Sequence, residues 1–221
     1  MDLLNQGVAK MEKGDYQEAA EYLETFIEKE PDNPLGYFQF ANLLSIMEDV
    51  KRSEVFYKKA LELDPDLSIA YFGLGHIYFD QDQLNQATDQ FLKARETGLE
   101  EVDNDFMIGM CFYLLESTEE SLPYFERAVQ EDPNRYEFNF HYGLALAQLD
   151  QVDEAVEWFE KAKTIDPENG DVYYNLGIAK LFKDEVDEAL EILYTAVEKD
   201  PEHELAFDAI FNIEQLLDEE E

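Results

Sequence analysis

The residues best able to do chemistry are three histidines and one cysteine, and their spacing argues against metal binding and catalysis. His76, His141 and His203 lie far apart, without the HExxH pattern or a neighbouring cysteine that a zinc site needs. Cys111 is the only cysteine, and no lysine or arginine stands near it in the sequence to activate its thiol. Acidic residues are so frequent that a pair of carboxylates identifies no general acid or base. We therefore predict a protein that is not an enzyme and holds neither metal nor cofactor.

The charge of the chain excludes further classes of function. Aspartate and glutamate number 53 against 16 lysines and arginines, for a formal net charge of −37. Binding to DNA, RNA or an anionic membrane requires a concentrated basic face, so we expect none of the three. No apolar run is long enough to cross a membrane and no leader peptide is recognisable, so we expect a cytoplasmic protein. The acidic residues form either a solvated outer surface or an attraction for a basic partner.

The elements that must position these residues follow from an internal repeat of 34 residues. Glycine or alanine returns at this spacing at Gly7, Ala41, Gly75, Gly109, Gly143 and Gly177. A second small residue follows each of them twelve positions later, at Ala19, Ser53, Ala87, Ser121, Ala155 and Ala189. Small residues in phase allow two helices to approach closely, and a large apolar residue four positions further on completes one helix face. Each 34-residue repeat is therefore predicted to contain two packed helices.

Most repeats end with a proline, whose ring cannot continue a helix. These prolines are Pro31, Pro65, Pro133, Pro167 and Pro201. The third repeat has Leu99 in this position, and we expect Gly98 to end that helix in a left-handed conformation. The predicted repeats are 1–33, 34–67, 68–101, 102–135, 136–169 and 170–203, followed by a capping helix at 204–217 and an acidic tail at 218–221. Together they predict a single solenoid over residues 1–221.

This pattern resembles the tetratricopeptide repeat, which has a period of 34 residues. The third repeat carries the family's residues at Tyr71, Leu74, Gly75, Tyr78, Ala87, Phe91 and Ala94. The resemblance implies an all-α fold, a right-handed α-α superhelical solenoid of six helix-turn-helix repeats plus a C-terminal capping helix. Phe26 and Asp105 are atypical for their positions. The segments around residues 11–30 and 40–50 look like the YrrB-like group of small stand-alone bacterial repeat proteins, which implies a cytoplasmic adaptor.

The predicted capping helix has no second helix after it. It places Leu205, Phe207, Ile210, Phe211 and Leu217 on one side. A terminal repeat would otherwise leave its apolar stacking face in water, so we expect this side to cover the last repeat.

Function in a helical solenoid is expected on the inner curved face, which the first helix of each repeat supplies. If the glycine positions face the second helix, the positions three before, one after and four after each glycine share another face. In the tetratricopeptide family these positions line the groove. Five of the six positions three before the glycine are aromatic here. We predict a peptide-binding groove formed by Phe38, Asn42, Phe72, His76, Phe79, Phe106, Met110, Tyr113, Phe140, Leu144, Tyr174 and Ile178.

The groove positions also predict the chemistry of a partner. None of the eighteen is lysine or arginine, so we expect no clamp for a C-terminal carboxylate. An apolar groove in an acidic protein suits a protein or peptide with an apolar stripe and basic flanks, such as an amphipathic helix. The same aromatic residues would also be explained by packing between adjacent first helices.

The sequence thus predicts a non-enzymatic scaffold or adaptor for protein–protein interaction. Two alternatives remain open. One is a chaperone-like holdase for apolar, basic client segments. The other is self-association into a homo-oligomer.

Overall fold

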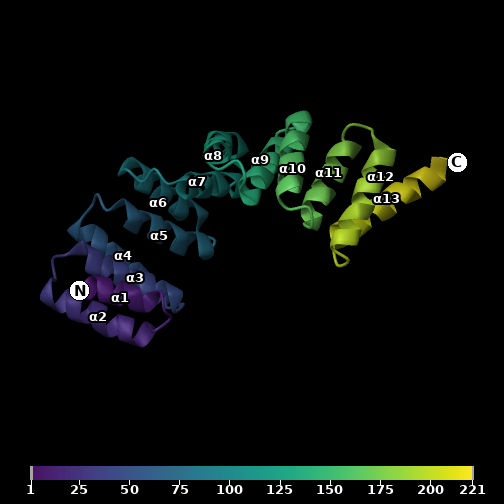
Figure 1. The fold of residues 1–221 in the computed structure, drawn as a ribbon. Helices are drawn as coiled ribbons and strands as arrows, with labels where there is room; N and C mark the ends of the chain where they lie inside the picture. Colours follow the sequence, from purple (N-terminus) through teal and green to yellow (C-terminus); the bar gives the residue numbers. More distant parts are fainter. Residues whose placement is uncertain (1, 221) are drawn as a thin grey trace. The chain divides into compact units, whose positions relative to one another are not determined.

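The structure is a computed structural model that describes residues 2–220, apart from the side chains of Glu219 and Glu220. In that range it contains thirteen α-helices and no strand (Figure 1). The helices are α1 (Leu3–Met11), α2 (Tyr16–Lys29), α3 (Pro34–Ile46), α4 (Val50–Leu63), α5 (Ser68–Asp80), α6 (Leu84–Glu96), α7 (Val102–Leu114), α8 (Thr118–Glu131), α9 (Tyr136–Gln148), α10 (Val152–Ile165), α11 (Gly170–Leu181), α12 (Val186–Lys199) and α13 (Glu204–Glu220). The predicted all-α fold of repeated helix pairs is confirmed.

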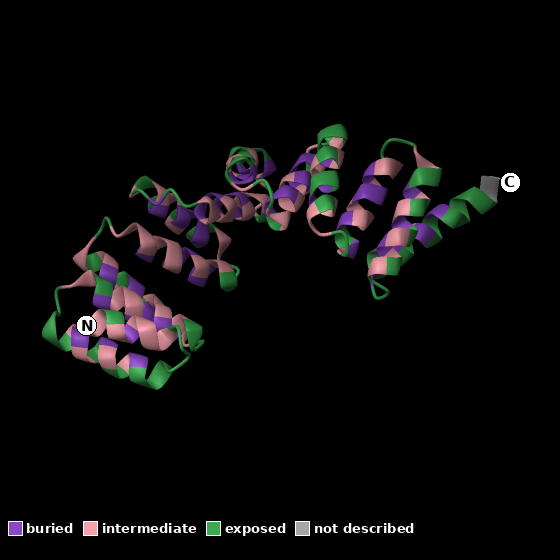
Figure 2. Ribbon diagram, in the orientation of Figure 1, coloured by how far each residue is buried: buried purple, intermediate pink, exposed green. Residues whose placement is uncertain are grey.

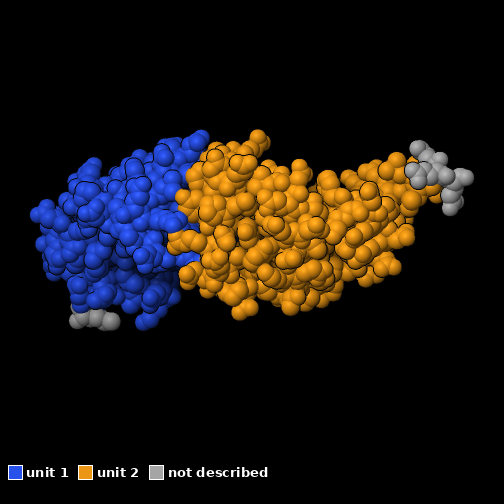
Figure 3. All heavy atoms as spheres, turned by 90° about the horizontal axis from the view of Figure 1, so that it is seen from above, with its two compact units in different colours: residues 1–111 blue, residues 112–221 orange. Residues whose placement is uncertain are grey.

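The chain divides into two compact units, unit 1 with residues 1–111 and unit 2 with residues 112–221, and the division falls inside α7 (Figure 3). In unit 1, α1 packs on α2, α3 on α4 and α5 on α6, and adjacent first helices also touch. In unit 2, α9 packs on α10, α11 on α12 and α13 on α12. Each unit is thus a stack of helix pairs, as in a solenoid. The single solenoid and the exact repeat limits stay predictions, and Glu221 of the expected tail lies outside the described residues.

Glycine in the first helix of a pair lets a large side chain of the second helix approach the backbone. A Cβ atom at Gly143 would lie 2.7 Å from a ring carbon of Phe159, and one at Gly177 would lie 2.7 Å from Cγ of Leu193. Phe159 and Leu193 each follow their glycine by sixteen positions, and both are buried. The repeated small residue is therefore the point of closest contact within these helix pairs.

The second repeat makes this contact differently. Ala41 stands in the glycine position, and Ser53 Oγ donates a hydrogen bond of 2.8 Å to its carbonyl oxygen. Tyr57, sixteen positions after Ala41, turns its ring toward Gly73 of the next repeat, where a Cβ atom would lie 2.5 Å from the tyrosine Cζ. Its hydroxyl donates a hydrogen bond of 2.5 Å to Oδ1 of Asn42. The ring of Tyr57 also packs on Phe38 of α3, so it contacts the first helices of two successive repeats, α3 and α5.

Atypical positions of the repeat are accommodated locally. Phe26 is buried, and the missing side chain of Gly36 makes room for it, because a Cβ atom there would lie 2.8 Å from the ring. Asp105 is buried and accepts a hydrogen bond of 2.8 Å from Nη1 of Arg95. The predicted left-handed helix end is confirmed, since α6 ends at Glu96 and Gly98 has φ of 102°.

The turn inside each helix pair contains one residue in the left-handed conformation. Gly14 has φ of 78°, and the equivalent residues at the 34-residue spacing have φ between 58° and 61°. These equivalents are Glu48, Asp82, Glu116, Asp150 and Asp184. A side chain costs roughly 1–2 kcal/mol in this conformation, and aspartate tolerates it better than glutamate because its short side chain can bond locally. We did not predict this position, because an exposed acid in a turn has no distinctive pattern in an acidic sequence.

The capping helix α13 differs from the expectation. Its residues Ile210 and Ile213 are buried in one cluster with Leu193 of α12, and Ala206 is also buried. The expected apolar side was wrong for every member except Ile210, because Leu205, Phe207, Phe211 and Leu217 are 59%, 48%, 61% and 41% exposed. Figure 2 shows exposed residues along much of α13. A single helix buries only a narrow stripe, and the two phenylalanines lie about 100° away from that stripe.

Replacing Gly143 with leucine tests the contact between α9 and α10. Leucine has a better helix propensity than glycine by about 1 kcal/mol, whereas overpacking costs about 1–3 kcal/mol. Because the new side chain must displace the Phe159 ring, we expect a net loss of stability in urea unfolding followed by circular dichroism. Gln148→Leu, on the exposed side of the same helix, is the control. A Gly143→Leu protein that is more stable than wild type would contradict this packing.

Replacing Glu116 with glycine tests the strained turn. Relief of a cost of about 1 kcal/mol is partly offset by the greater freedom of glycine in the unfolded chain, so we expect a gain of about 0.5 kcal/mol. The matched change Gly14→Glu should lower the free energy of unfolding by about 1 kcal/mol, because φ of 78° is then imposed on a side chain. Both are measured as shifts of the urea midpoint. Shifts of the same sign in the two variants would refute the strain.

Candidate functional site

Unit 1 contains an open groove of about 510 Å³ along α3 and α5. Four of the twelve predicted groove residues line it, namely Phe38, Asn42, Phe72 and His76. The other lining residues are Met11, Ser45, Ile46, Tyr57, Ile69 and Gly73. Met11 and Ser45 each lie four positions after a repeated small residue, in the same column as Phe79 and Tyr113. The first helices of the first three repeats therefore contribute most of the surface.

Sequence reasoning missed Ile46, Tyr57, Ile69 and Gly73 as lining residues. Tyr57 belongs to a second helix, and we took the predicted groove positions from first helices only. A signal for it existed, because the second repeat has Ala41 in place of glycine while the next repeat has an additional glycine at position 73. Together these two residues indicate that the large side chain of the second repeat, Tyr57, reaches the additional glycine of the next repeat.

The polar groups of the groove are held in one arrangement. Tyr57 Oη donates to Asn42 Oδ1, and Asn42 Nδ2 donates a hydrogen bond of 3.3 Å to Gln39 Oε1. Burial raises the pKa of Tyr57 to about 12, so its hydroxyl keeps its proton at neutral pH and can act as the donor. The amide of Asn42 is thus held on both sides, with its oxygen accepting from tyrosine and its Nδ2 group donating to glutamine.

His76 is a neutral group in this groove. Burial lowers the pKa of its imidazole, and the carboxylates of Asp80 and Asp103 act in the opposite direction. The ring lies edge-on to Phe72, with centroids 4.6 Å apart, and to Phe91, with centroids 5.2 Å apart. Among residues 2–220 no group of three histidine, cysteine or acidic side chains could hold a metal ion. The imidazole therefore supplies a polar point on an aromatic wall.

All twelve predicted groove residues are half-buried. In unit 2, the ring of Phe140 stacks on Tyr136 at 5.3 Å between centroids and lies 5.9 Å from Phe159. Tyr174 packs on His203 at 5.0 Å. Ile178 lines a small pocket of about 50 Å³. The aromatic side chains thus pack on other rings and also keep part of their surface accessible. The remaining predicted residues, Phe79, Phe106, Met110, Tyr113 and Leu144, are also half-buried.

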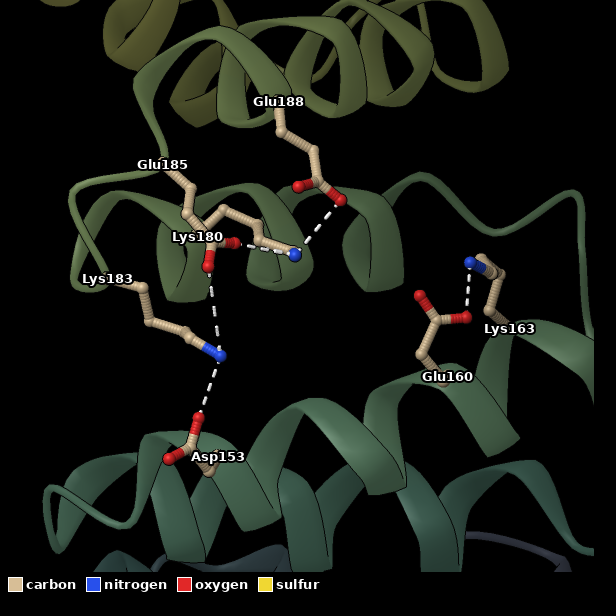
Figure 4. A network of polar contacts seen from close by, with 7 residues as sticks. All are labelled: Asp153, Glu160, Lys163, Lys180, Lys183, Glu185 and Glu188. Carbon is tan, nitrogen blue, oxygen red and sulfur yellow. Dashed lines mark hydrogen bonds and ion pairs between the residues drawn. The ribbon is translucent and has the colours of Figure 1, made fainter.

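Basic side chains of unit 2 are engaged with neighbouring acids (Figure 4). Lys180 Nζ lies 2.7 Å from Glu185 and 2.9 Å from Glu188, and these hydrogen bonds raise the pKa of the lysine. Lys183, in the turn after α11, lies 2.7 Å from Asp153 of α10. Exposed ion pairs of this kind contribute little to stability. Their consequence is electrostatic, because they cancel positive charges in a chain that already has a large excess of acids.

Cys111 is fully buried in unit 1. Burial raises the pKa of its thiol to about 11, although a hydrogen bond with Thr88 acts slightly the other way. A thiol of this kind is protonated at neutral pH and unreactive as a nucleophile. Cys111 therefore packs as a small apolar core residue.

Comparison with known proteins identifies the family. Tetratricopeptide repeat models match residues 3–33, 36–67, 56–89 and 106–170. The crystal structure of YrrB, described as a TPR protein with an unusual peptide-binding site, has 37% sequence identity and a TM-score of 0.82, and the match covers 86% of this chain and 98% of YrrB. The chain belongs to the tetratricopeptide repeat family. The predicted resemblance to the YrrB type is confirmed.

More distant structures share the fold. PilF of Pseudomonas aeruginosa has 15% identity and a TM-score of 0.78, with 93% of this chain and 94% of PilF covered. MamA from Desulfovibrio magneticus RS-1 has 17% identity and a TM-score of 0.73, with 78% of this chain and 97% of the MamA chain covered. No curated protein sequence matches the chain.

Tetratricopeptide repeat proteins are interaction modules that bind protein or peptide partners, generally without catalysis. The chain therefore has the architecture of a scaffold for protein–protein interaction. No helix in the described part of the chain is long and apolar enough to span a membrane.

The state of Cys111 can be tested with a thiol reagent. A thiol with pKa near 11 has roughly 100-fold less thiolate at pH 8 than one with the ordinary value of 9.0, so we expect native protein to react at least that much more slowly than urea-unfolded protein. Because the folded pKa is raised, the thiol stabilises the fold below pH 9, and this contribution is lost between about pH 9 and 11.

Cys111→Ser is the control for the pH dependence, because a hydroxyl does not titrate in this range. We expect its unfolding free energy to fall less steeply than that of wild type above pH 9. Equal reactivity of the thiol in native and unfolded protein would show that Cys111 is accessible.

Proposed function

We propose that this protein is a non-enzymatic scaffold that binds a peptide segment of a partner protein in the groove of unit 1. The observation that carries the proposal is an open groove of about 510 Å³ in which the rings of Phe38 and Phe72 remain partly accessible. Exposed apolar surface of this kind usually marks a binding site. Support also comes from YrrB, a relative described as having a peptide-binding site.

The proposed partner has an apolar stripe and basic flanks. Apolar residues dominate the groove lining, which favours apolar side chains in the ligand. Asp80 and Asp103 lie close enough to His76 to act on its pKa, so negative charge is present beside the groove. Lysine or arginine on either side of the apolar stripe would be attracted to this charge and would speed association. An amphipathic helix satisfies both requirements.

The other predicted residues would extend the binding surface within their own units. Phe79, Phe106 and Met110 would do so in unit 1, and Tyr113, Phe140, Leu144, Tyr174 and Ile178 in unit 2. The proposed activity is cytoplasmic and needs no catalytic residue, cofactor, nucleic acid or membrane.

The groove is tested by selecting phage-displayed peptides on wild-type protein and measuring the affinity of the enriched peptides for Phe38→Ser/Phe72→Ser. We expect at least about 10-fold weaker binding, because losing apolar contact worth about 1.4 kcal/mol changes the dissociation constant by a factor of ten. The control is Val55→Ser, a residue of α4 in the same unit that is 62% exposed and lies outside the groove lining. Circular dichroism melting checks that the variants fold.

If the double variant does not fold, Ser45→Arg provides a second test. It leaves the aromatic packing intact and introduces a positive charge into the groove lining, which should repel a basic ligand. Enriched peptides that bind wild type and both groove variants equally would refute the proposal. Weak binding of peptides without a shared pattern would indicate a holdase, and a mass that doubles with concentration would indicate self-association.

A further inference from the structure

Helix α13 occupies the position of a first helix in the repeat register. Phe211 follows Gly177 by 34 residues, and Phe207 follows Tyr173 by the same spacing. In α11, the backbone at Gly177 receives the side chain of Leu193 from α12. The equivalent face of α13 is covered by no helix among the described residues, because Phe207 and Phe211 are 48% and 61% exposed.

This exposed face is apolar, and exposed apolar patches usually mark interaction surfaces. Phe207 and Phe211 are spaced by four residues and therefore form one stripe along α13. Tyr194 of α12, which is 48% exposed, donates a hydrogen bond to Glu214 on the same side of α13. Three exposed rings thus accompany α13 and α12 at this end of unit 2.

The charge around the stripe selects the kind of partner. Glu204, Asp208, Glu214 and Asp218 of α13 are exposed, and the segment from 200 to 218 contains no lysine or arginine. Lys199, the last basic residue before it, lies 2.6 Å from Glu168. A second copy would bring the same carboxylates into contact with each other, in a chain of net charge −37. Charge complementarity therefore favours a partner with basic residues.

The shape of the stripe selects the partner further. Within a repeat the first helix supplies the small residue and the second helix supplies the large one, as with Gly177 and Leu193. On α13 this order is reversed, because Phe211 occupies the glycine position. A helix that packs here closely must present small residues opposite Phe211.

We propose that the Phe207–Phe211 face of α13 binds one amphipathic helix of a partner protein, which presents alanine or glycine toward Phe211 and lysine or arginine on its flanks. The bound helix takes the place that a second helix has in the preceding repeats. This surface belongs to unit 2, whereas the groove of the proposed function belongs to unit 1, so different variants test the two proposals.

The probe is a fluorescein-labelled helical peptide with alanines along one face, leucines beside them and lysines on the flanks. Its binding to the whole chain is followed by fluorescence anisotropy. In a chain that also carries Phe38→Ser/Phe72→Ser, so that the groove of unit 1 does not compete for the probe, we expect Phe207→Ser/Phe211→Ser to weaken binding at least 10-fold. The matched control is Leu205→Ser/Leu216→Ser, which removes two equally exposed apolar residues, 59% and 63%, from another side of the same helix and should change affinity less than 2-fold.

Two further proteins keep the outcome decisive. Asp208→Lys/Asp218→Lys reverses exposed charges without removing apolar packing, and should weaken the basic probe even if the phenylalanine variant folds poorly. The basic amphipathic probe also suits the groove of unit 1, so Phe38→Ser/Phe72→Ser alone should lose only the part of the binding that this groove provides and keep the part that α13 provides.

The proposal is overturned if the probe does not bind wild type, or if it binds the α13 phenylalanine and charge variants as tightly as wild type. It is equally overturned if only the groove variant loses binding. Sedimentation of the protein without the probe completes the test, since dimers that disappear in Phe207→Ser/Phe211→Ser would identify a second copy as the occupant.

Discussion

The contact between the backbone of a first helix and one large side chain of its second helix is the constraint on which the rest of the structure depends. At Gly143 and Gly177 this contact leaves no space for a Cβ atom. It brings the two helix axes together and thereby determines which face of each first helix is buried. The contact also bears on function, because the residues on the remaining faces of the first helices stay partly accessible. The same glycine that packs the two helices thus leaves the first-helix positions of the proposed binding surface partly accessible.

The groove of unit 1 arises where this rule is relaxed. With Ala41 in the glycine position, the ring of Tyr57 lies against Gly73 of the next repeat as well as against Phe38 of its own repeat. Its hydroxyl then orients Asn42, so one exchange of residues supplies both an aromatic wall and a fixed amide. The second repeat lacks the usual glycine at position 41, and the next repeat has an additional glycine at position 73.

The charge distribution underlies the selectivity that we propose. Lysines such as Lys180 and Lys183 are paired with acids of their own unit, so the large excess of carboxylates acts outward. Long-range attraction of this kind speeds association with basic partners and disfavours acidic ones, while apolar contacts provide most of the affinity. The groove of unit 1 and the exposed face of α13 combine the two in different geometries. One is a concave surface lined by several helices, and the other is a convex stripe on a single helix.

The sequence by itself determined the period, the helix pairs and the left-handed end at Gly98, because these depend on short-range patterns of glycine, proline and apolar residues. It also placed Phe38, Asn42, Phe72 and His76 on one face by helical spacing. The tertiary structure alone decided where Tyr57 points, since that depends on space at Gly73 in another repeat. It likewise decided which side of α13 is buried, because the apolar residues of that helix surround it and only packing against α12 selects among them.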